Sequence, residues 1–236
     1  MHKTDLPQYA IDGAIRRRGK LHQFEEIEPS KSALIVIDMQ NAFLQVGSPA
    51  EVPVAREIVP NINELATAFR KNGGTVAWVQ MTQTEDSLID WSVFYNGVNN
   101  PDRASRMIGV LSEGSEGHAI WPELDVGDED LVVQKDRYSA FLPGASDLAE
   151  VLEHRGIDTV VITGTLTNVC SESSARDAMM RNFKTMMISD ANAAPTDEEH
   201  IASLAAILQV FGDIYSMQEI IQLLENGHKS ETVAAE

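Results

Sequence analysis

The only cysteine of the chain, Cys170, lies where a run of apolar residues ends and a segment with helical spacing begins. The unpaired backbone N–H groups and the dipole at the first turn of a helix stabilise anions, so we expect this thiol to ionise more easily than a buried one. Asn168 or Thr167 is the expected N-cap of that helix. A lone cysteine is more often a small core residue than a catalyst. Its position here nevertheless favours a nucleophile whose neighbouring N–H groups hold an oxyanion.

Polar side chains also end other apolar runs of the sequence. Asp38 ends "ALIVID", Gln80 ends "TVAWVQ" and Lys135 ends "LVVQK". Open parallel sheets bind ligands at the carboxyl ends of their strands, so we expect these side chains to share one edge with Cys170. A carboxylate there can take the proton of the thiol and pass it to a leaving amine, while an ammonium tunes the carboxylate. Taken singly, Asp38 can equally be a cap or turn residue, and Lys135 a solvated charge.

The predicted base is a carboxylate because no histidine is suitably placed. None of the six histidines ends a predicted strand, and we expect them to be structural or exposed; they are His2, His22, His118, His154, His200 and His228. The sequence also contains no P-loop, no G-x-G-x-x-G, no G-x-S-x-G and no H-E-x-x-H. Covalent catalysis without a dissociable cofactor is the chemistry that remains.

The elements that must position these residues follow from hydrophobic periodicity. Apolar runs typical of strands buried on both faces occur at residues 33–38, 75–80, 131–135, 158–164, 184–190 and, more weakly, 212–216. Helical spacing occurs at residues 58–69, 148–156, 170–183 and 197–210. This alternation predicts an α/β protein with a parallel sheet covered on both faces. Residues 81–127 lack clear regular structure and are expected to form a lid, a binding loop or a subunit contact.

Composition limits the classes of partner. The chain has 18 basic and 36 acidic residues, a net charge of −18, so its field repels nucleic acid and anionic lipid. The single cysteine cannot form an internal disulfide and the first twenty residues lack the apolar core of a signal peptide, so we expect a cytoplasmic protein. We expect one domain at residues 31–226, after an N-terminal extension of residues 1–30 and before a mobile tail of residues 227–236.

Five stretches together resemble the isochorismatase-like cysteine hydrolases, which include nicotinamidases, N-carbamoylsarcosine amidohydrolases and ureidoacrylate amidohydrolases. They are "ALIVIDMQNAF", "GSEGHAIWPEL", "VQKDRYSAF", "GTLTNVCSESSARDA" and "ISDANAA". The resemblance extends from near Ser32 to near Ile221, and its closest local similarity is to the ureidoacrylate and N-carbamoyl amidohydrolases. It implies a single-domain three-layer α/β/α sandwich with a mainly parallel, Rossmann-like sheet.

The resemblance also implies roles for individual residues. Asp38, Lys135 and Cys170 would form a catalytic triad, which agrees with the interpretation of the residues themselves. A cis peptide bond between Leu166 and Thr167 would aim the N–H groups of Thr167 and Cys170 at the carbonyl oxygen of the substrate. No metal is implied.

Substrate contacts are less well defined by the sequence. Asn41, Gln80 and Tyr138 can hydrogen-bond a substrate amide or carboxylate, but each can equally satisfy local backbone groups. Trp91 is expected in the pocket or in a subunit contact. Arg137 can pair with a substrate carboxylate, with a surface salt bridge as the favoured alternative.

The resulting hypothesis is a cysteine amidohydrolase that cleaves a small amide or N-carbamoyl compound through a thioester and releases ammonia or an amine. The stretch "VQMTQTED" at residues 79–86 contains no histidine, which argues against a metal-containing nicotinamidase. Cys170 argues against the vinyl-ether cleavage of true isochorismatases, which lack the nucleophile. The alternatives are a non-amide hydrolase of isochorismatase type and a catalytically silent binding or scaffold protein. The resemblance implies a homo-oligomer, a dimer or tetramer.

Overall fold

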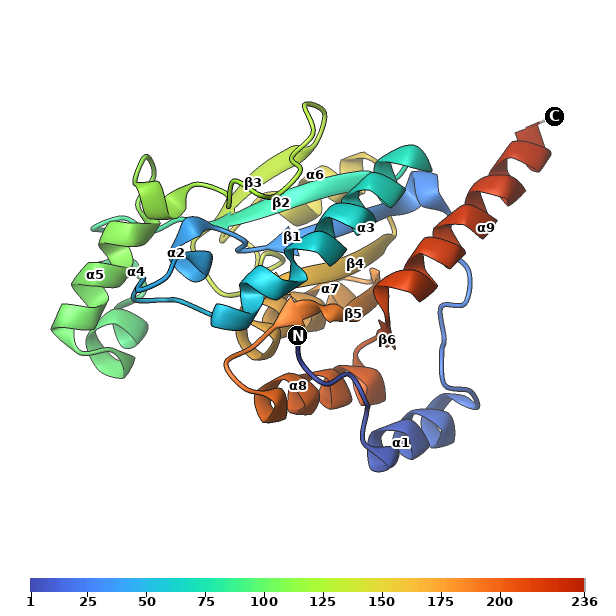
Figure 1. Cartoon of the computed structure of the whole chain (residues 1–236), viewed down its shortest axis with the longest axis horizontal. Coiled ribbons are helices and arrows are strands. Elements are labelled where there is room, and N and C mark those ends of the chain that lie inside the picture. The colour runs from blue at the N-terminus through green and yellow to red at the C-terminus, as the bar shows by residue number, and fades with distance from the viewer. Residues whose placement is uncertain (236) are drawn as a thin grey trace.

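A six-stranded parallel sheet forms the centre of the protein (Figure 1). The computed structural model describes the backbone of residues 1–235 and the side chains of residues 1–230. The strands are β1 (Ser32–Ile37), β2 (Thr75–Met81), β3 (Leu131–Lys135), β4 (Thr159–Thr165), β5 (Lys184–Ala193) and β6 (Asp213–Tyr215). Their order is β3-β2-β1-β4-β5-β6, and each neighbouring pair is parallel. The predicted α/β fold with a parallel sheet is confirmed.

Helices cover both faces of this sheet and complete three layers (Figure 1). One face is covered by α3 (Val59–Lys71) and α9 (Met217–Ala235), and the other by α1 (Gln8–Arg18), α6 (Leu148–His154), α7 (Glu172–Met180) and α8 (Asp197–Val210). Successive side chains of a strand point to opposite faces. Leu34 and Val36 of β1 therefore join the α3 layer, whereas Ile35 and Ile37 join the other. This two-sided burial explains the continuous apolar runs of the sequence.

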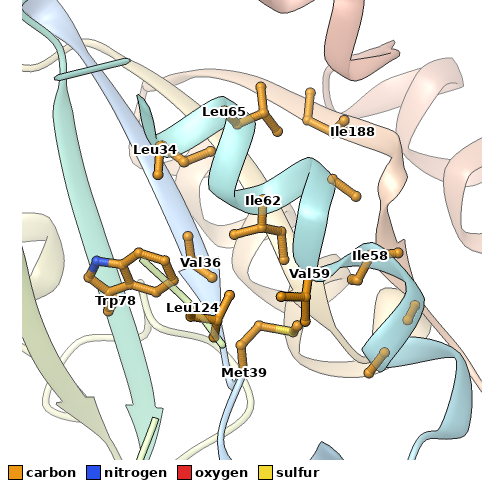
Figure 2. Packing of buried hydrophobic residues seen from close by; sticks show 14 of the residues in the cluster. Leu34, Val36, Met39, Ile58, Val59, Ile62, Leu65, Trp78, Leu124 and Ile188 are labelled. Carbon is orange, nitrogen blue, oxygen red and sulfur yellow. The ribbon is translucent and has the colours of Figure 1, made fainter. Parts of the chain in front are cut away.

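The contact between α3 and β1 shows how the core positions the strand ends. Figure 2 shows Ile62 and Leu65 of α3 packed toward Leu34 and Val36 of β1, with Trp78 of β2 alongside. All five side chains are buried. Burial of each aliphatic side chain of this kind stabilises the fold by about 1.5–3 kcal/mol. Packing against α3 thus fixes the position of β1 up to its last residues, directly before Asp38.

The N-terminal segment packs against the domain. Ala10 and Ala14 of α1 are fully buried in the layer that contains α8. Arg18, at the end of α1, pairs with the buried carboxylate of Asp213 at 2.6 Å. The second oxygen of Asp213 accepts the N–H groups of Gln23 and Phe24 at 2.7 Å each. Residues 1–30 are thus tied to the β6 end of the sheet.

Helix α9 continues through Gly227 to Ala235, so the segment expected to form a tail is helical up to that residue. A Cβ atom on Gly227 would lie 1.9 Å from the carbonyl oxygen of Ile27. This glycine therefore allows close packing within a helix instead of ending one. Residue 236, the end of the expected tail, lies outside the described residues. No helix within residues 1–235 is both long and apolar enough to cross a membrane.

The segment at residues 81–127 has more regular structure than the sequence analysis predicted. It contains α4 (Ser87–Asp90), a π-helical turn at Val93–Val98 and α5 (Pro101–Leu111), and α4 and α5 lie together at one end of the molecule (Figure 1). The side chain of Asn100 caps α5 by accepting the N–H of Arg103 at 2.9 Å. The buried side chains of α5 are Ala104, Met107, Ile108 and Leu111, whose spacing is helical. This cap and spacing were the signals that the prediction missed.

We predict that Gly164→Ala destabilises the protein strongly. Gly164 has a φ of +109°, and a Cβ atom there would lie 2.1 Å from the carbonyl oxygen of Ile37. Strand β4 must move away from β1 to accommodate it, so we expect the free energy of unfolding to fall by more than about 3 kcal/mol. Urea denaturation measures this change. The control Gly109→Ala adds a Cβ to the exposed face of α5, where nothing lies within 4 Å. An equally small effect for both variants would contradict the close strand contact.

Candidate active site

The structure brings Asp38, Lys135 and Cys170 together at the carboxyl ends of the strands. Asp38 follows β1, Lys135 ends β3, and Cys170 lies in the turn after β4. Lys135 Nζ is 2.8 Å from Asp38 Oδ2, and both side chains are fully buried. Cys170, 3% exposed, lies close enough to both groups to influence the pKa of each. The strand order reverses direction between β1 and β4, which is where open α/β sheets bind ligands.

Asp38 has an unusual backbone conformation, with a φ of 52°. A non-glycine residue in this region costs about 1–3 kcal/mol and persists only where its surroundings hold it. Here the N–H of Asp38 donates to the carbonyl of Val79 at 2.9 Å, and Thr165 Oγ1 donates to the carbonyl of Asp38 at 3.2 Å. These contacts with β2 and β4 hold the turn that directs the carboxylate toward Lys135 and Cys170.

Lys135 is a buried ammonium whose donors are used. Its Nζ donates to Asp38 Oδ2, to the carbonyl of Arg137 at 3.1 Å and to Met81 Sδ at 3.3 Å. Burial by itself would lower the pKa of Lys135, but the facing Asp38 and Cys170 raise it above its ordinary value. Lys135 is therefore positively charged and sets the field at the thiol and the carboxylate.

The carboxyl group of Asp38 is suited to accept a proton. Burial raises its pKa, and the opposing effect of Lys135 does not fully offset this. Oδ2 is occupied by the Lys135 ammonium, whereas Oδ1 accepts no N–H or O–H donor from the described residues. The neighbouring Cys170 thiol is thus the donor available to this carboxylate.

The expectation that the Cys170 thiol ionises easily is wrong for the unliganded protein. Burial raises its pKa well above the ordinary value and Asp38 raises it further, although Lys135 lowers it. Cys170 also lies in a π-helical turn at Thr167–Ser171, which directly precedes α7 at Glu172, and not in the first turn of an α-helix. Burial and a neighbouring carboxylate therefore outweigh the effect of the helix N-terminus, and the resting thiol is neutral.

The turn that carries Cys170 is attached to α8 and to the N-terminal segment. The expected caps do not form: the Thr167 hydroxyl meets His200 Nδ1 at 2.9 Å, and Ser203 donates to the carbonyl of Thr167. His200 Nε2 lies 2.9 Å from the carbonyl of Ser189 and must be the donor, so Nδ1 accepts from Thr167. Burial, together with the stacked ring of His2 at 4.7 Å, lowers the pKa of His200 to about 4. This structural histidine is therefore neutral.

Two further details of the turn differ from expectation. The cis peptide bond joins Thr165 to Leu166, one bond before the expected Leu166–Thr167 bond. Strand β4 extends to Thr165, so the turn begins at that bond. Asn168, the other expected cap, instead contacts Glu199 Oε1 of α8 through its Nδ2 at 3.5 Å.

A cavity of about 360 Å³ opens onto Cys170. Its walls are mainly apolar and include Phe43, Met81, Phe94, Met107, Leu111 and Val169. Tyr138 and Arg103 add polar groups. Burial, with a smaller contribution from Cys170, raises the pKa of Tyr138 to about 12, so its hydroxyl is a neutral hydrogen-bonding group.

Of the four residues proposed from sequence to contact substrate, Tyr138 lines this cavity, and Asn41, Gln80 and Trp91 do not. Asn41 Nδ2 donates to the carbonyl of Glu116, and Gln80 Nε2 to that of His118, each at 2.8 Å. These two side chains satisfy backbone groups, which was the alternative interpretation. Trp91 packs behind the wall against Tyr138 and Phe94, with ring centroids 4.8 and 4.4 Å apart.

Other polar residues near the site are accounted for locally. Arg137 pairs with Asp136 at 3.2 Å, donates to the carbonyl of Asp90 and lies 5.2 Å from the centre of the Trp91 ring. This agrees with a salt bridge, the favoured alternative for Arg137. Residues 1–230 contain no group of three or more His, Cys, Asp and Glu side chains that can hold a metal ion. Arg103 was not identified from the sequence, because α5 was not predicted.

Known proteins are similar to this chain in sequence and in architecture. The sequence model of the Isochorismatase domain family matches residues 32–219. The ureidoacrylate amidohydrolase RutB of Acinetobacter baylyi is 28% identical over 223 residues, covering 86% of this chain and 88% of that protein. The crystal structure of a cysteine hydrolase from Pseudomonas syringae superposes with a TM-score of 0.75 at 27% identity, covering 88% of this chain and 98% of that one.

A second solved structure, the N-carbamoylsarcosine amidase of Thermoplasma acidophilum, superposes with a TM-score of 0.62 at 25% identity, covering 79% of this chain and 96% of that one. The family match extends from the first residue of β1 to the beginning of α9. It therefore contains all six strands and the three side chains that meet at their ends. On this match, the chain belongs to the isochorismatase family of hydrolases.

Proposed function

We propose that this protein is a cysteine-dependent amidohydrolase that cleaves a small amide or N-carbamoyl compound. The observation that carries the proposal is a buried thiol that faces both a carboxylate with a free oxygen and a fixed ammonium, at the floor of an apolar cavity. The similarity to proteins named ureidoacrylate amidohydrolase and N-carbamoylsarcosine amidase supports it.

In the first half of the proposed reaction, Asp38 Oδ1 takes the proton from Cys170 as the sulfur attacks the carbonyl carbon of the substrate. The carbonyl oxygen becomes an oxyanion, which the backbone N–H groups of Thr167 and Cys170 are proposed to hold. The tetrahedral intermediate then collapses. The C–N bond breaks, Asp38 returns its proton to the leaving nitrogen, and ammonia or an amine departs from a thioester on Cys170.

In the second half, a water molecule takes the place of the leaving group. Asp38 removes a proton from this water, whose oxygen attacks the thioester carbonyl. The C–S bond then breaks and the sulfur recovers the proton from Asp38, so that acid product and resting enzyme are formed. The raised pKa of the Asp38 carboxyl suits a group that must hold a proton between these steps. Lys135 offsets the negative charge that passes between sulfur and carboxylate.

The first prediction of this proposal is thiol-dependent ammonia release. Wild-type protein, without added metal, is incubated with a panel of small amides and ureido acids, and ammonia is measured enzymatically. Because the nucleophile is lost, we expect Cys170→Ala to lower kcat by more than about 10⁴-fold on any substrate found. Ser173→Ala, a half-buried change in the first turn of α7, three residues after Cys170, is the matched control. Equal turnover by wild type and Cys170→Ala would point to a non-amide or non-covalent hydrolase.

The second prediction concerns the resting thiol. Thiolate formation is followed by ultraviolet absorbance against pH, with the Cys170→Ala protein subtracted to remove the tyrosine contribution. Since burial and Asp38 raise the pKa of Cys170, we expect thiolate absorbance to increase only above about pH 9. A midpoint below the ordinary thiol value of about 8.5 would show that the thiol is already activated before substrate binds.

A further inference from the structure

The first residues of the chain lie outside the family match, which begins at Ser32, yet they contact the edge of the sheet that carries the active site. Figure 1 shows the N-terminus beside the end of β5. The contact is made by His2, whose side chain is only 4% exposed. A buried polar side chain so close to the start of a chain needs partners that hold it in place.

Two polar contacts hold the ring of His2. Its Nδ1 donates to Asp197 Oδ1 at 2.8 Å, and this hydrogen bond lowers the pKa of Asp197, which is therefore ionised. Its Nε2 lies 3.0 Å from both the backbone nitrogen and the carbonyl oxygen of Ala194. A neutral ring accepts from that N–H and a protonated ring donates to that carbonyl. Nε2 therefore has a partner in either protonation state, and the position of the ring does not depend on which state is present.

The ring of His2 covers His200 of α8. The two rings are stacked, with centroids 4.7 Å apart and planes inclined by 23°. Both nitrogens of His200 are engaged, by the Thr167 hydroxyl and by the carbonyl of Ser189, each at 2.9 Å. His200 is completely buried. The ring of His2 is thus part of the barrier that separates His200 from water.

The hydrogen bond between His200 and Thr167 depends on the protonation of His200. Nδ1 accepts the Thr167 hydroxyl only while it carries no proton, because a charged imidazole has donors on both nitrogens. Thr167 begins the π-helical turn that contains Cys170, and its backbone N–H is one of the two proposed to hold the oxyanion. A proton on His200 would therefore force this contact to break or reverse, and would disturb the turn from which the thiol attacks.

The surroundings of His200 keep it neutral. Burial is the main cause of its pKa of about 4, and His2 lowers the pKa further, whereas the carbonyl of Ser189 and the carboxylate of Asp197 raise it. Lys3 lies 3.8 Å from the second oxygen of Asp197. Loss of the His2 ring would admit water to one face of His200, so its pKa would rise toward the ordinary value of about 6.5.

We propose that His2 is a positioning residue for the nucleophile: its ring, held at the start of α8, covers His200 and so preserves the hydrogen bond to Thr167 that fixes the turn of Cys170. The catalytic consequence rests on the proposed function. His2 acts through His200 and does not line the cavity. The N-terminal segment, which precedes the family domain, thus completes the support of the active site.

Nuclear magnetic resonance tests the structural step without a substrate. The ring signals of His200 and the backbone amide signals of Thr167 and Cys170 are followed against pH. In wild-type protein we expect His200 to stay neutral above about pH 5. His2→Asn removes the ring but keeps a hydrogen-bonding side chain. In this variant we expect the midpoint of His200 to move toward about pH 6.5, and both amide signals to shift with the same midpoint.

Turnover of a substrate from the amide panel tests the catalytic step. The ratio of kcat between His2→Asn and wild type cancels the titration of Asp38, which both proteins share. Because only neutral His200 holds the turn, we expect this ratio to fall about tenfold at one pH unit below the midpoint measured for His200. KM should not change, since His2 does not line the cavity.

Two further variants separate the ring from other effects. His2→Phe keeps a ring over His200 without the polar contacts, so the low midpoint of His200 and the wild-type kcat should be retained. His22→Asn is the matched control, because it removes a stacked histidine from the same N-terminal segment. His22 stacks on Tyr215 of β6, with centroids 4.3 Å apart. Its loss should leave the midpoint of His200 and kcat unchanged.

Three results would overturn the role of His2. They are an unchanged midpoint of His200 in His2→Asn, an equal rise of the midpoint in His2→Phe, and a raised midpoint that neither the turn amides nor the kcat ratio follows. If the amides follow His200 but wild-type protein turns over no substrate, the positioning role stands and the amidohydrolase proposal fails. If ammonia release depends on Cys170 while amides and kcat ratio ignore His200, the proposed function stands and the role of His2 fails.

Discussion

The arrangement of the site depends on the contact between Asp38 and Lys135, which is made entirely out of water. Removing an ion from water costs several kcal/mol in proteins, so a buried pair requires close geometry and further hydrogen bonds. Both conditions are met, with Nζ 2.8 Å from Oδ2 and with Arg137 and Met81 as additional acceptors for Lys135. The pair connects the ends of β1 and β3 across β2. It also occupies one carboxylate oxygen and leaves the other beside Cys170.

The sheet makes this geometry available at the switch point between β1 and β4. Gly164 allows β4 to approach the backbone of Ile37 closely. Asp38 follows Ile37 in the chain, and its positive φ turns the carboxylate out of the line of β1. The turn after β4 carries Cys170. The hydrogen bond between the Thr167 hydroxyl and the neutral His200 attaches this turn to α8. The constraints that fix nucleophile and base are therefore backbone constraints, whereas part of the cavity wall comes from the separate π-helical turn at Val93–Val98 and from α5.

Much of this could be predicted from the sequence, for identifiable physical reasons. Strands buried on both faces leave uninterrupted apolar runs in the sequence. These runs predicted the strand ends at Asp38 and Lys135 and the edge of the sheet that they share with Cys170. The state of the Cys170 thiol was not, because its pKa depends on burial and on a carboxylate far away in the chain. Helix α5 was missed because its apolar residues lie among many polar ones, so their helical spacing was not recognised. Arg103 was missed with it.

The most direct test of the central claim is the covalent state of Cys170 during turnover. Wild-type protein is mixed with a substrate, quenched in acid within the first turnovers, and digested for mass spectrometry. The proposed chemistry predicts that the peptide containing Cys170 gains the mass of the acyl or carbamoyl group, and that the adduct disappears when substrate is exhausted. Product formation at the full rate with an unmodified Cys170 peptide at every quench time, and with undiminished turnover by the Cys170→Ala protein, would contradict it.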